Sequence, residues 1–365
     1  MTNNTKTTIL PLNRLYQFVI GLLSVLLYSN TGIIVAQNEK PYEMACVAFY
    51  NLENLFDTIH QEGVNDYEFL PDGKNQWNSE KYHSKISNMA KVISQIGTAS
   101  TPTGPVVLGV AEIENRNPLE DLVNDPQIKE RNYQIVHRDG PDRRGVDVAL
   151  LYNPSFFVLD TFLTYPLIIP DMPDFRTREQ LLVKGKLMGE EFHFIVVHWP
   201  SRTGGEAKSR PLRIAAAELS KYLFDSIMAI KPDAKIIFMG DLNDDPTDKS
   251  VSGVLKATSD KKKIASGKYL FNPSEILFKN GIGSLAYRDS WNMFDQMILT
   301  PSIYTDNRTT LSYYQFKVFN ERWLRQTNGQ YKDYPLRTFA GSAWLNGYSD
   351  HFPVYVLLIR ELKTK

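Results

Sequence analysis

The stretch Lys235-Ile-Ile-Phe-Met-Gly-Asp-Leu-Asn243 is the best guide to the fold of this chain. Residues 235–239 are mostly apolar and predict a strand, which ends at Gly240 and Asp241. An acid placed directly after an apolar strand lies where strands meet loops, and loops commonly carry the residues that do chemistry. The same combination of apolar strand and polar end is therefore the pattern to follow through the rest of the sequence.

Strand-like runs recur on both sides of this stretch and alternate with helical patterns. Further strands are predicted over residues 46–50, 105–111, 147–152, 180–188, 192–198, 294–299 and 352–359. Residues 80–97 and 209–230 carry apolar side chains at helical spacing. No repeat or interdomain linker interrupts the alternation, so we expect one large layered α/β domain over residues 37–365.

Several of these strands end in, or begin just after, an acid, an amide or a histidine. The residues are Asn51 and Glu53, Glu112, His198, Asp241 and Asn243, and Asp350 and His351. One such boundary is ordinary because Asp and Asn start many turns, but five on separate strands indicate a shared rim where loops converge. A rim rich in oxygen ligands and poor in thiols favours Mg²⁺, with Mn²⁺ or Ca²⁺ as alternatives, over zinc.

Composition excludes some classes of protein. The 365 residues include 41 Lys+Arg and 41 Asp+Glu, so the formal net charge is zero and the chain lacks the basic excess typical of sequence-independent nucleic-acid binders. The only cysteine is Cys46, which rules out a disulfide within the chain and a cysteine-rich zinc site. Its apolar neighbours indicate a packing role.

Residues 1–36 differ from the rest and predict a signal peptide. They contain Lys6 and Arg14 but no acid, and residues 18–27 form a short apolar run. Ala36 then precedes a polar stretch, which completes the layout of a cleavable export signal. The apolar run is too short for a comfortable membrane span, although a retained anchor is the alternative. We therefore expect a secreted or periplasmic protein, monomeric and without a membrane span after processing.

Seven short segments occur in an order that resembles the endonuclease/exonuclease/phosphatase superfamily, which is deoxyribonuclease I-like. They are Asn51-Leu-Glu-Asn-Leu-Phe56, Val110-Ala-Glu112, Gly145-Val-Asp-Val-Ala149, Val197-His198-Trp199, Gly240-Asp-Leu-Asn243, Phe294-Asp-Gln-Met297 and Ser349-Asp-His351. The resemblance implies a four-layered α/β/β/α sandwich, in which two mixed β-sheets are flanked by helices and the active site lies at one end. It also implies metal-dependent hydrolysis of phosphoester bonds.

The resemblance assigns a metal role to residues at the ends of several predicted strands. Glu112 matches the principal metal ligand of the family, and Asn51 would assist it. Asp350 would either ligate the metal or hold its turn. Glu53 lies two residues beyond Asn51, so alternation places both on one strand face if the strand continues. It is then a second metal ligand, a supporting acid or a plain turn residue.

The catalytic assignments follow from the same motifs. Asp241 would orient or deprotonate the attacking water, and the amide of Asn243 would hold the phosphate or the metal's water shell. His351 would be paired with Asp295, because a carboxylate fixes the tautomer of a histidine and favours its protonated form. His198 would be paired with Asp147 in the same way. The alternative for Asp147 is a strand acid tied to Arg143 or Arg144.

Substrate choice is open in the sequence. Arg202 and Arg210, with Lys208 and Arg213, form a local basic cluster that could bind phosphate, or they belong to a solvated loop and helix start. Residues 304–348 form an extended segment rich in aromatic residues, which either stack on bases or pack in the core. The first hypothesis is an exported nuclease acting on DNA or RNA. The alternatives are a phosphatase or phosphodiesterase on inositol phosphates, phospholipids or other small phosphoesters, and a binding protein on a retired hydrolase scaffold.

Overall fold

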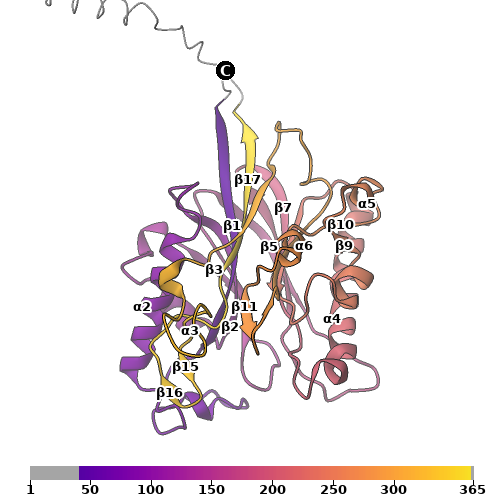
Figure 1. Ribbon diagram of the computed structural model, residues 1–365. Helices are drawn as coiled ribbons and strands as arrows, with labels where there is room; N and C mark the ends of the chain where they lie inside the picture. Colours follow the sequence, from indigo (N-terminus) through magenta and orange to yellow (C-terminus); the bar gives the residue numbers. More distant parts are fainter. Residues whose placement is uncertain (1–40, 363–365) are drawn as a thin grey trace, which may run out of the picture. The chain divides into compact units, whose positions relative to one another are not determined.

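Two β-sheets packed face to face form the centre of the molecule (Figure 1). The structure is a computed structural model and describes residues 41–362. The predicted signal peptide of residues 1–36 lies outside the described residues. The first sheet has the strand order β14-β17-β1-β2-β4-β3. Its strands are β14 (Ser312–Val318), β17 (Val354–Glu361), β1 (Tyr42–Leu55), β2 (Pro105–Ile113), β4 (Asp147–Tyr152) and β3 (Gln134–His137).

The second sheet has the order β5-β6-β7-β8-β13-β10-β9. It consists of β5 (Phe157–Tyr165), β6 (Gln180–Leu187), β7 (Glu190–His198), β8 (Ile236–Asp241), β13 (Asp295–Leu299), β10 (Leu270–Phe271) and β9 (Ala257–Thr258). Both sheets are mixed: β1 pairs in parallel with β2 and antiparallel with β17, while β7 pairs in parallel with β8. A core of aliphatic and aromatic side chains, including Phe49, Phe194 and Met239, fills the space between the sheets.

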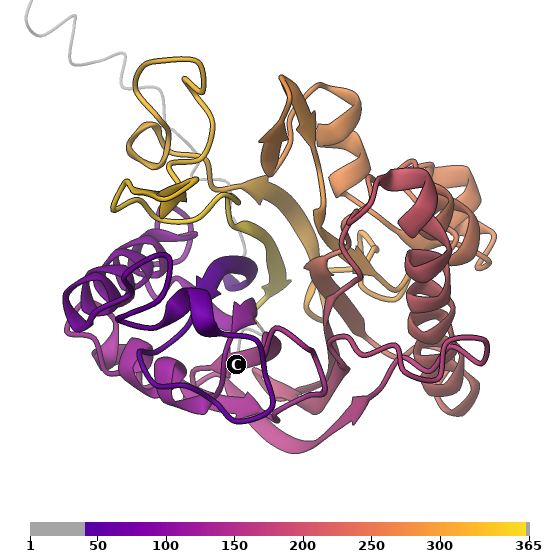
Figure 2. The ribbon, with the colours of Figure 1, turned by 90° about the horizontal axis from the view of Figure 1, so that it is seen from below.

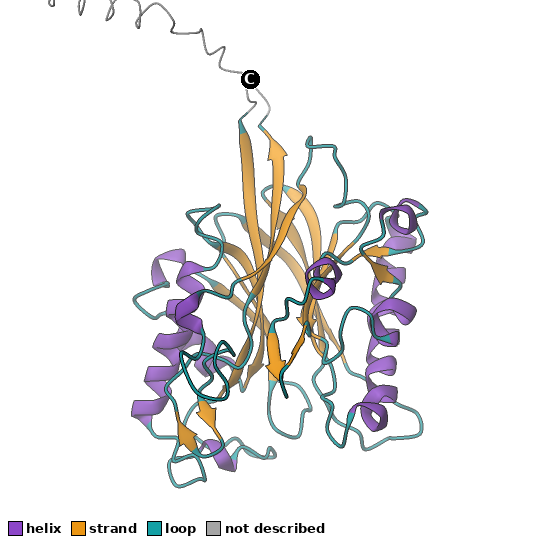
Figure 3. Ribbon diagram, in the orientation of Figure 1, coloured by secondary structure: helices purple, strands orange, loops and turns teal. Residues whose placement is uncertain are grey.

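Helices cover the outer faces of both sheets (Figure 3). On the first sheet lie α2 (Ser79–Gln95) and α3 (Arg116–Val123), and on the second lies α4 (Glu206–Ile230). The short helices α5 (Lys261–Ala265) and α6 (Ser274–Lys279) lie in the connections around β10. The predicted four-layered α/β/β/α sandwich is thus confirmed. Among the described residues, no helix is both long and apolar enough to cross a membrane.

The helices form where the sequence predicts them because local and tertiary signals agree. At the start of α2 the side chain of Asn78 accepts a hydrogen bond from the backbone of Lys81 at 3.1 Å, which caps the helix. Its apolar face, with Ile86 and Met89, is buried against the first sheet. Helix α4 begins at Glu206, three residues before the helical pattern that starts at residue 209.

Two small antiparallel hairpins complete the fold. One consists of β11 (Leu285–Tyr287) and β12 (Ser290–Asn292), and the other of β15 (Phe339–Ala340) and β16 (Ala343–Trp344). The second hairpin belongs to the extended segment of residues 304–348. Strand β14 at the start of that segment pairs with β17, so the segment contributes an edge strand to the first sheet before it continues towards β15.

The strand directions place the expected site at one end of the sandwich. Strands β1, β2, β7 and β8 all finish at this end, and β4, β13 and β17 begin there, as their pairing registers require. Figure 2 shows the molecule from this side, with the hairpins and loops arranged around the strand ends. The rim predicted from polar residues at strand boundaries is therefore present.

Candidate active site

Asp241 lies at the centre of the site because of strand register. On one side β8 pairs in parallel with β7, which sets His198 opposite Asp241. On the other side β8 pairs antiparallel with β13, which sets Asp295 opposite Asp241. Three chemically active residues, separated by tens of positions in sequence, are thus brought side by side by backbone pairing alone.

The predicted pair of His351 and Asp295 is present. Nδ1 of His351 lies 2.7 Å from Oδ2 of Asp295, which is fully buried and also accepts a hydrogen bond from Ser284. Nε2 of His351 then faces Oδ2 of Asp241 at 3.9 Å. Burial alone lowers the pKa of His351, but Asp295 and Asp241 outweigh it and raise the pKa well above its ordinary value. The imidazole is therefore held as a cation with one N–H directed into the site.

Asp241 is held in place by two donors. Its Oδ2 accepts a hydrogen bond from the amide of Asn51 at 3.1 Å, and its Oδ1 accepts one from the backbone of Asn243 at 2.9 Å. Burial, followed by the negative charges of Asp295 and Glu112, raises the pKa of Asp241 to about 7, although His351 counteracts this. A carboxylate that exchanges protons near neutral pH suits the role of a base for water.

His198 has the opposite electrostatic setting. Its ring is buried, and Nε2 lies 3.6 Å from Asp241 and 3.8 Å from Oε1 of Glu112. Burial, with the positive charges of Arg178 and Arg144, lowers the pKa of His198 well below its ordinary value. Its Nδ1 has no hydrogen-bond partner in the described part of the chain. The site thus combines one neutral histidine with one charged histidine.

The prediction that Asp147 is the partner of His198 is wrong. Asp147 accepts hydrogen bonds from His137 at 3.4 Å and from the backbone of Gly140 at 3.1 Å, so its carboxylate is used elsewhere. The reason is the local surroundings of Asp147. It begins β4 beside β3, which carries His137, and this histidine and the backbone of Gly140 already engage its carboxylate. The alternative of a tie to Arg143 or Arg144 is not what the structure shows either.

Glu112 contacts residues from both sheets. Its Oε2 accepts a hydrogen bond from the backbone of Asn54 at 3.0 Å, and its Oε1 is directed towards His198. The guanidinium of Arg144 lies 4.0 Å from Oε2 and also bonds to the side chain of Asn54. The sequence did not indicate the contact between Arg144 and Glu112. The two residues lie tens of positions apart, and only the folded chain brings them together.

The backbone around these residues is strained. Glu112 has φ = 58°, and Glu53, Asn54 and Asn243 have φ values of 49°, 53° and 50°. Residues with side chains seldom adopt this left-handed conformation, and its concentration at one rim is typical of functional sites. At Asn243 it turns the backbone N–H back towards Asp241, while the side-chain amide donates to the carbonyl of Trp199 at 3.0 Å. The expected contact of Asn243 with phosphate stays a prediction.

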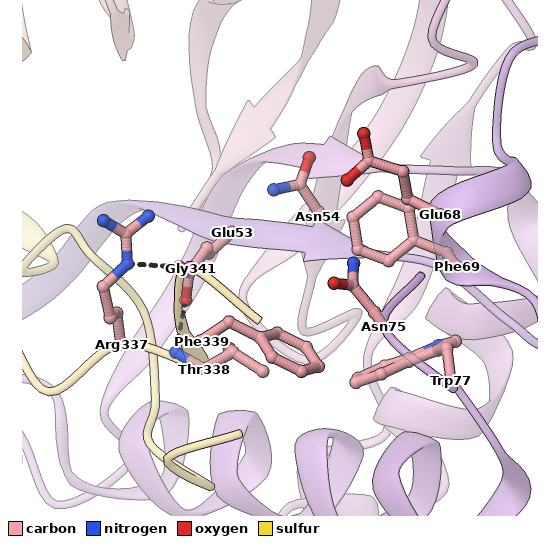
Figure 4. A pocket seen from close by; sticks show the side chains of 10 residues that line it. All are labelled: Glu53, Asn54, Glu68, Phe69, Asn75, Trp77, Arg337, Thr338, Phe339 and Gly341. Atoms are coloured by element: carbon pink, nitrogen blue, oxygen red, sulfur yellow. Dashed lines mark hydrogen bonds and ion pairs between the residues drawn. The ribbon is translucent and has the colours of Figure 1, made fainter. Parts of the chain in front are cut away.

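The left-handed turn also explains why Glu53 does not join Asn51 as a metal ligand. Alternation ends at Glu53, and its buried side chain is directed towards Arg337 and Thr338 (Figure 4). Its two oxygens accept hydrogen bonds from Arg337 at 3.1 Å and from the backbone of Thr338 at 2.7 Å, and Nζ of Lys85 lies 3.7 Å away. Glu53 is therefore a supporting acid, one of the alternatives that the sequence left open.

Arg337 links Glu53 to the end of the last loop. Besides Glu53 it binds Oδ2 of Asp350 at 2.9 Å, while Oδ1 of Asp350 lies 4.0 Å from Nε2 of His351. Arg337 is 45% exposed, so the pair faces solvent beside the site. A metal role for Asp350 stays a prediction. The sequence showed Arg337 within the aromatic segment but gave no sign of these partners.

The predicted phosphate-binding cluster is neutralised by acids. Arg202 binds the carboxylate of Asp248 at 2.9 Å and the backbone carbonyl of Asn243 at 2.8 Å, and Arg210 binds Glu206 one turn away at 2.6 Å. Substrate binding by Arg202 and Arg210 stays a prediction, because a phosphate would have to compete with these acids for each guanidinium.

The donor chemistry of the rim fits a divalent cation that prefers oxygen. Glu112 keeps Oε1 free of backbone donors, and Asn51 and Asp241 lie beside it. Asp241, Asp295 and His351 also place one ligand atom each within 4.8 Å of the others. Within the group of Asp241, Asp295 and His351, however, His351 and Asp295 already form a hydrogen bond of 2.7 Å with each other. The oxygens around Glu112 are therefore the better candidates for binding Mg²⁺.

Comparison with known proteins agrees with this geometry. The model of the Endonuclease/Exonuclease/phosphatase family matches residues 46–360. An endonuclease/exonuclease/phosphatase family protein from Bacteroides thetaiotaomicron has a similar structure, with 18% identity, a TM-score of 0.52, and coverage of 89% of this chain and 98% of that one. None of the curated proteins matches the sequence closely enough to count as a relative.

Two further solved structures share the fold. Truncated TDP2 from Caenorhabditis elegans is 16% identical with a TM-score of 0.51, and the match covers 86% of this chain and 97% of that one. The mannosyl-6-phosphatase of Bacteroides thetaiotaomicron VPI-5482 is 17% identical with a TM-score of 0.50, over 86% and 99% of the respective chains.

The two histidines differ in protonation, and NMR can measure the difference. At pH 6.5, where an unperturbed histidine is about half protonated, we expect His198 to be neutral and His351 to be a cation in the metal-free protein. Nitrogen shifts of the imidazole rings would be recorded after treatment with chelator and assigned with His198→Gln and His351→Gln. Two rings that are both half protonated at this pH would contradict the electrostatics described above.

Proposed function

Because the chain belongs to the endonuclease/exonuclease/phosphatase family of phosphoester hydrolases, we propose that it is a phosphodiesterase that requires a divalent cation and acts as a nuclease. The observation that carries the proposal is the bond of 2.7 Å between His351 and Asp295, with Nε2 of the same ring 3.9 Å from Asp241. This arrangement sets a proton donor and a base side by side, which hydrolysis of a charged ester needs.

The residues divide the reaction between them. Asp241, with a pKa of about 7, holds the attacking water and accepts its proton. The cationic His351 and the neutral His198 direct N–H groups at the oxygens on which charge develops, and Asn51 keeps Asp241 in place. A divalent ion held by Glu112, with Asn51 and Asp350 as further candidates, would withdraw charge from the phosphoryl oxygens. Mg²⁺ is the ion we propose, on the oxygen chemistry of these ligands.

The ion pairs between arginines and acids of this chain indicate which kind of nucleic acid it would bind. A long duplex is held largely through contacts between basic side chains and phosphates. Here Arg202, Arg210 and Arg213 are bound to acids of their own chain, and the net charge of the sequence is zero. We therefore propose short or single-stranded nucleic acid as the substrate, in preference to long duplex DNA.

A double-mutant cycle tests the catalytic pair. His351→Ala is expected to lower turnover of a chromogenic phosphodiester by roughly 10²–10⁴-fold in the presence of Mg²⁺. Asp295→Asn is expected to cost a similar factor, and the double variant little more, because the two groups act as a unit. Initial rates at saturating substrate give each value.

The chain offers a matched control for that cycle. His137 and Asp147 form a second histidine–aspartate pair, with 3.4 Å between Nε2 and Oδ2, away from His351. His137→Ala and Asp147→Asn should leave turnover nearly unchanged. Losses that simply multiply for His351 with Asp295, or an equal loss in the control pair, would mean that the proposed pair is not a catalytic unit.

Glu112 tests the proposed metal requirement. Glu112→Gln removes one negative charge and preserves shape, so Mg²⁺ affinity is expected to fall about tenfold or more, with a loss of turnover. Titration calorimetry of Mg²⁺ into the chelator-treated protein measures this directly. Glu120→Gln, on the exposed face of α3, is the control. Unchanged Mg²⁺ binding in Glu112→Gln would show that Glu112 has a structural role only.

Export is proposed on the sequence of residues 1–36, with cleavage after Ala36 and a secreted or periplasmic product. Mass spectrometry of the native protein is expected to find an N-terminus near Gln37 outside the cytoplasmic membrane. An intact Met1 in the cytosolic fraction would contradict this.

A further inference from the structure

A cavity of about 630 Å³ lies beside the site, between two segments far apart in sequence. One wall is the β11–β12 hairpin and the other is residues 326–341 of the extended segment. Figure 2 shows both segments at the rim end of the molecule. The side chains that matter here are Tyr287, Arg288, Gln330, Tyr331, Arg337 and Asp350, which all line the cavity. Its volume is in the range of pockets that hold a nucleotide-sized ligand.

The cavity lies next to the catalytic residues. Asp350 and Arg337 line it, and Asp350 precedes His351, whose Nε2 lies 4.0 Å from Oδ1 of Asp350. A substrate whose phosphate lies at His351 can therefore reach this cavity with the group next to that phosphate. Arg337, which binds both Glu53 and Asp350, fixes the boundary between the two.

Large aromatic surfaces in the cavity are left uncovered. Tyr287 is 62% exposed and Tyr331 is 48% exposed, although both are bulky rings. The guanidinium of Arg288 lies 5.1 Å from the ring centre of Tyr287, and Tyr331 lies 5.6 Å from Tyr334. Exposed rings and guanidinium planes grouped in a concave site are suited to stacking against another flat ring.

The walls are tied together, so the cavity is formed before a ligand arrives. The hydroxyl of Tyr334 donates to Oδ1 of Asp289 at 2.7 Å and accepts from the backbone of Asp289 at 2.7 Å. The ring of Tyr334 also packs against Trp291, with 6.0 Å between centres. These contacts join the β11–β12 hairpin to the extended segment.

We propose that this cavity binds the nucleobase adjacent to the scissile phosphate, with Tyr287 and Tyr331 as the residues that determine specificity. The proposal rests on the proposed phosphodiesterase function and names the part of the substrate that the enzyme selects. The side-chain amides of Gln326 and Gln330, which line the cavity, have no hydrogen-bond partner within residues 41–362 and match the donors and acceptors of a base edge.

A sugar fits the cavity less well than a base. Sugar hydroxyls are best bound by charged acceptors, and one oxygen of each carboxylate in the cavity is already engaged, Oδ1 of Asp289 by Tyr334 and Oδ2 of Asp350 by Arg337. The accessible surface consists instead of tyrosine rings. A flat ring covers such a surface more completely than a puckered one does, so stacking favours the base.

Binding of two ligands that differ only in the base tests this. Titration calorimetry with the chelator-treated mature chain, after adding Mg²⁺, would compare adenosine 5′-monophosphate with ribose 5-phosphate. We expect the nucleotide to bind about tenfold more tightly, and Tyr331→Ala and Tyr287→Ala each to remove most of that difference. Tyr222→Ala, at an exposed tyrosine on α4 (60% exposed), should change neither value. Circular dichroism confirms folding, and the two cavity variants provide independent tests.

Three results would overturn the proposal. They are equal affinities for the two ligands in the wild type, an equal loss for both ligands in Tyr331→Ala and Tyr287→Ala, and a dependence on these tyrosines for mannose 6-phosphate instead of the nucleotide. The measurement does not depend on turnover. A protein that prefers the nucleotide but hydrolyses no phosphodiester would refute the proposed function alone, and an active protein without the preference would refute the proposed cavity role alone.

Discussion

Repulsion between buried carboxylates at the strand ends is the constraint on which the rest of the site depends. Asp241 and Asp295 are brought opposite each other by the pairing of β8 with β13, and Glu112 is close enough to raise the pKa of Asp241. Such a group of negative charges is stable only when cations and donors are supplied. His351 supplies one cation, and Asn51 and the backbone of Asn243 supply donors. The remaining demand for positive charge supports the divalent ion that we propose at this rim, and such an ion would in turn offset the charge of a phosphate.

The same constraint gives the two histidines different chemistry. His351 lies against Asp295 and close to Asp241, so its positive charge is favoured in spite of burial. His198 is equally buried but has Arg178 and Arg144 among its charged neighbours, and its positive charge is disfavoured. One residue type thus provides a charged donor and a neutral donor within one site, through the distribution of charge on neighbouring strands.

Sequence reasoning succeeded for apolar patterns and for some ordered motifs, and failed where a partner is set by the folded chain alone. The strand ends and the layered α/β class could be predicted from apolar runs, and the pairing of His351 with Asp295 from the motifs of the family that the chain resembles. The true partner of Asp147 could not be predicted, because nothing in the sequence shows that β3 places His137 beside it. Glu53 left the expected face through one left-handed φ angle, and Arg202 was neutralised by Asp248, which lies on another loop.

The tie between Tyr334 and Asp289 belongs to the part of the molecule that we propose to select a ligand, which is separate from the strand ends that hold the candidate catalytic residues. The β11–β12 hairpin and residues 326–341 bind to each other, whereas the reacting groups are fixed by strand register in the two sheets. Lengthening or replacing a surface loop costs little conformational entropy compared with disturbing a packed sheet. If the proposed cavity role holds, a lineage can exchange this loop pair, and with it the compounds on which the protein acts, while inheriting an unaltered set of acids and bases.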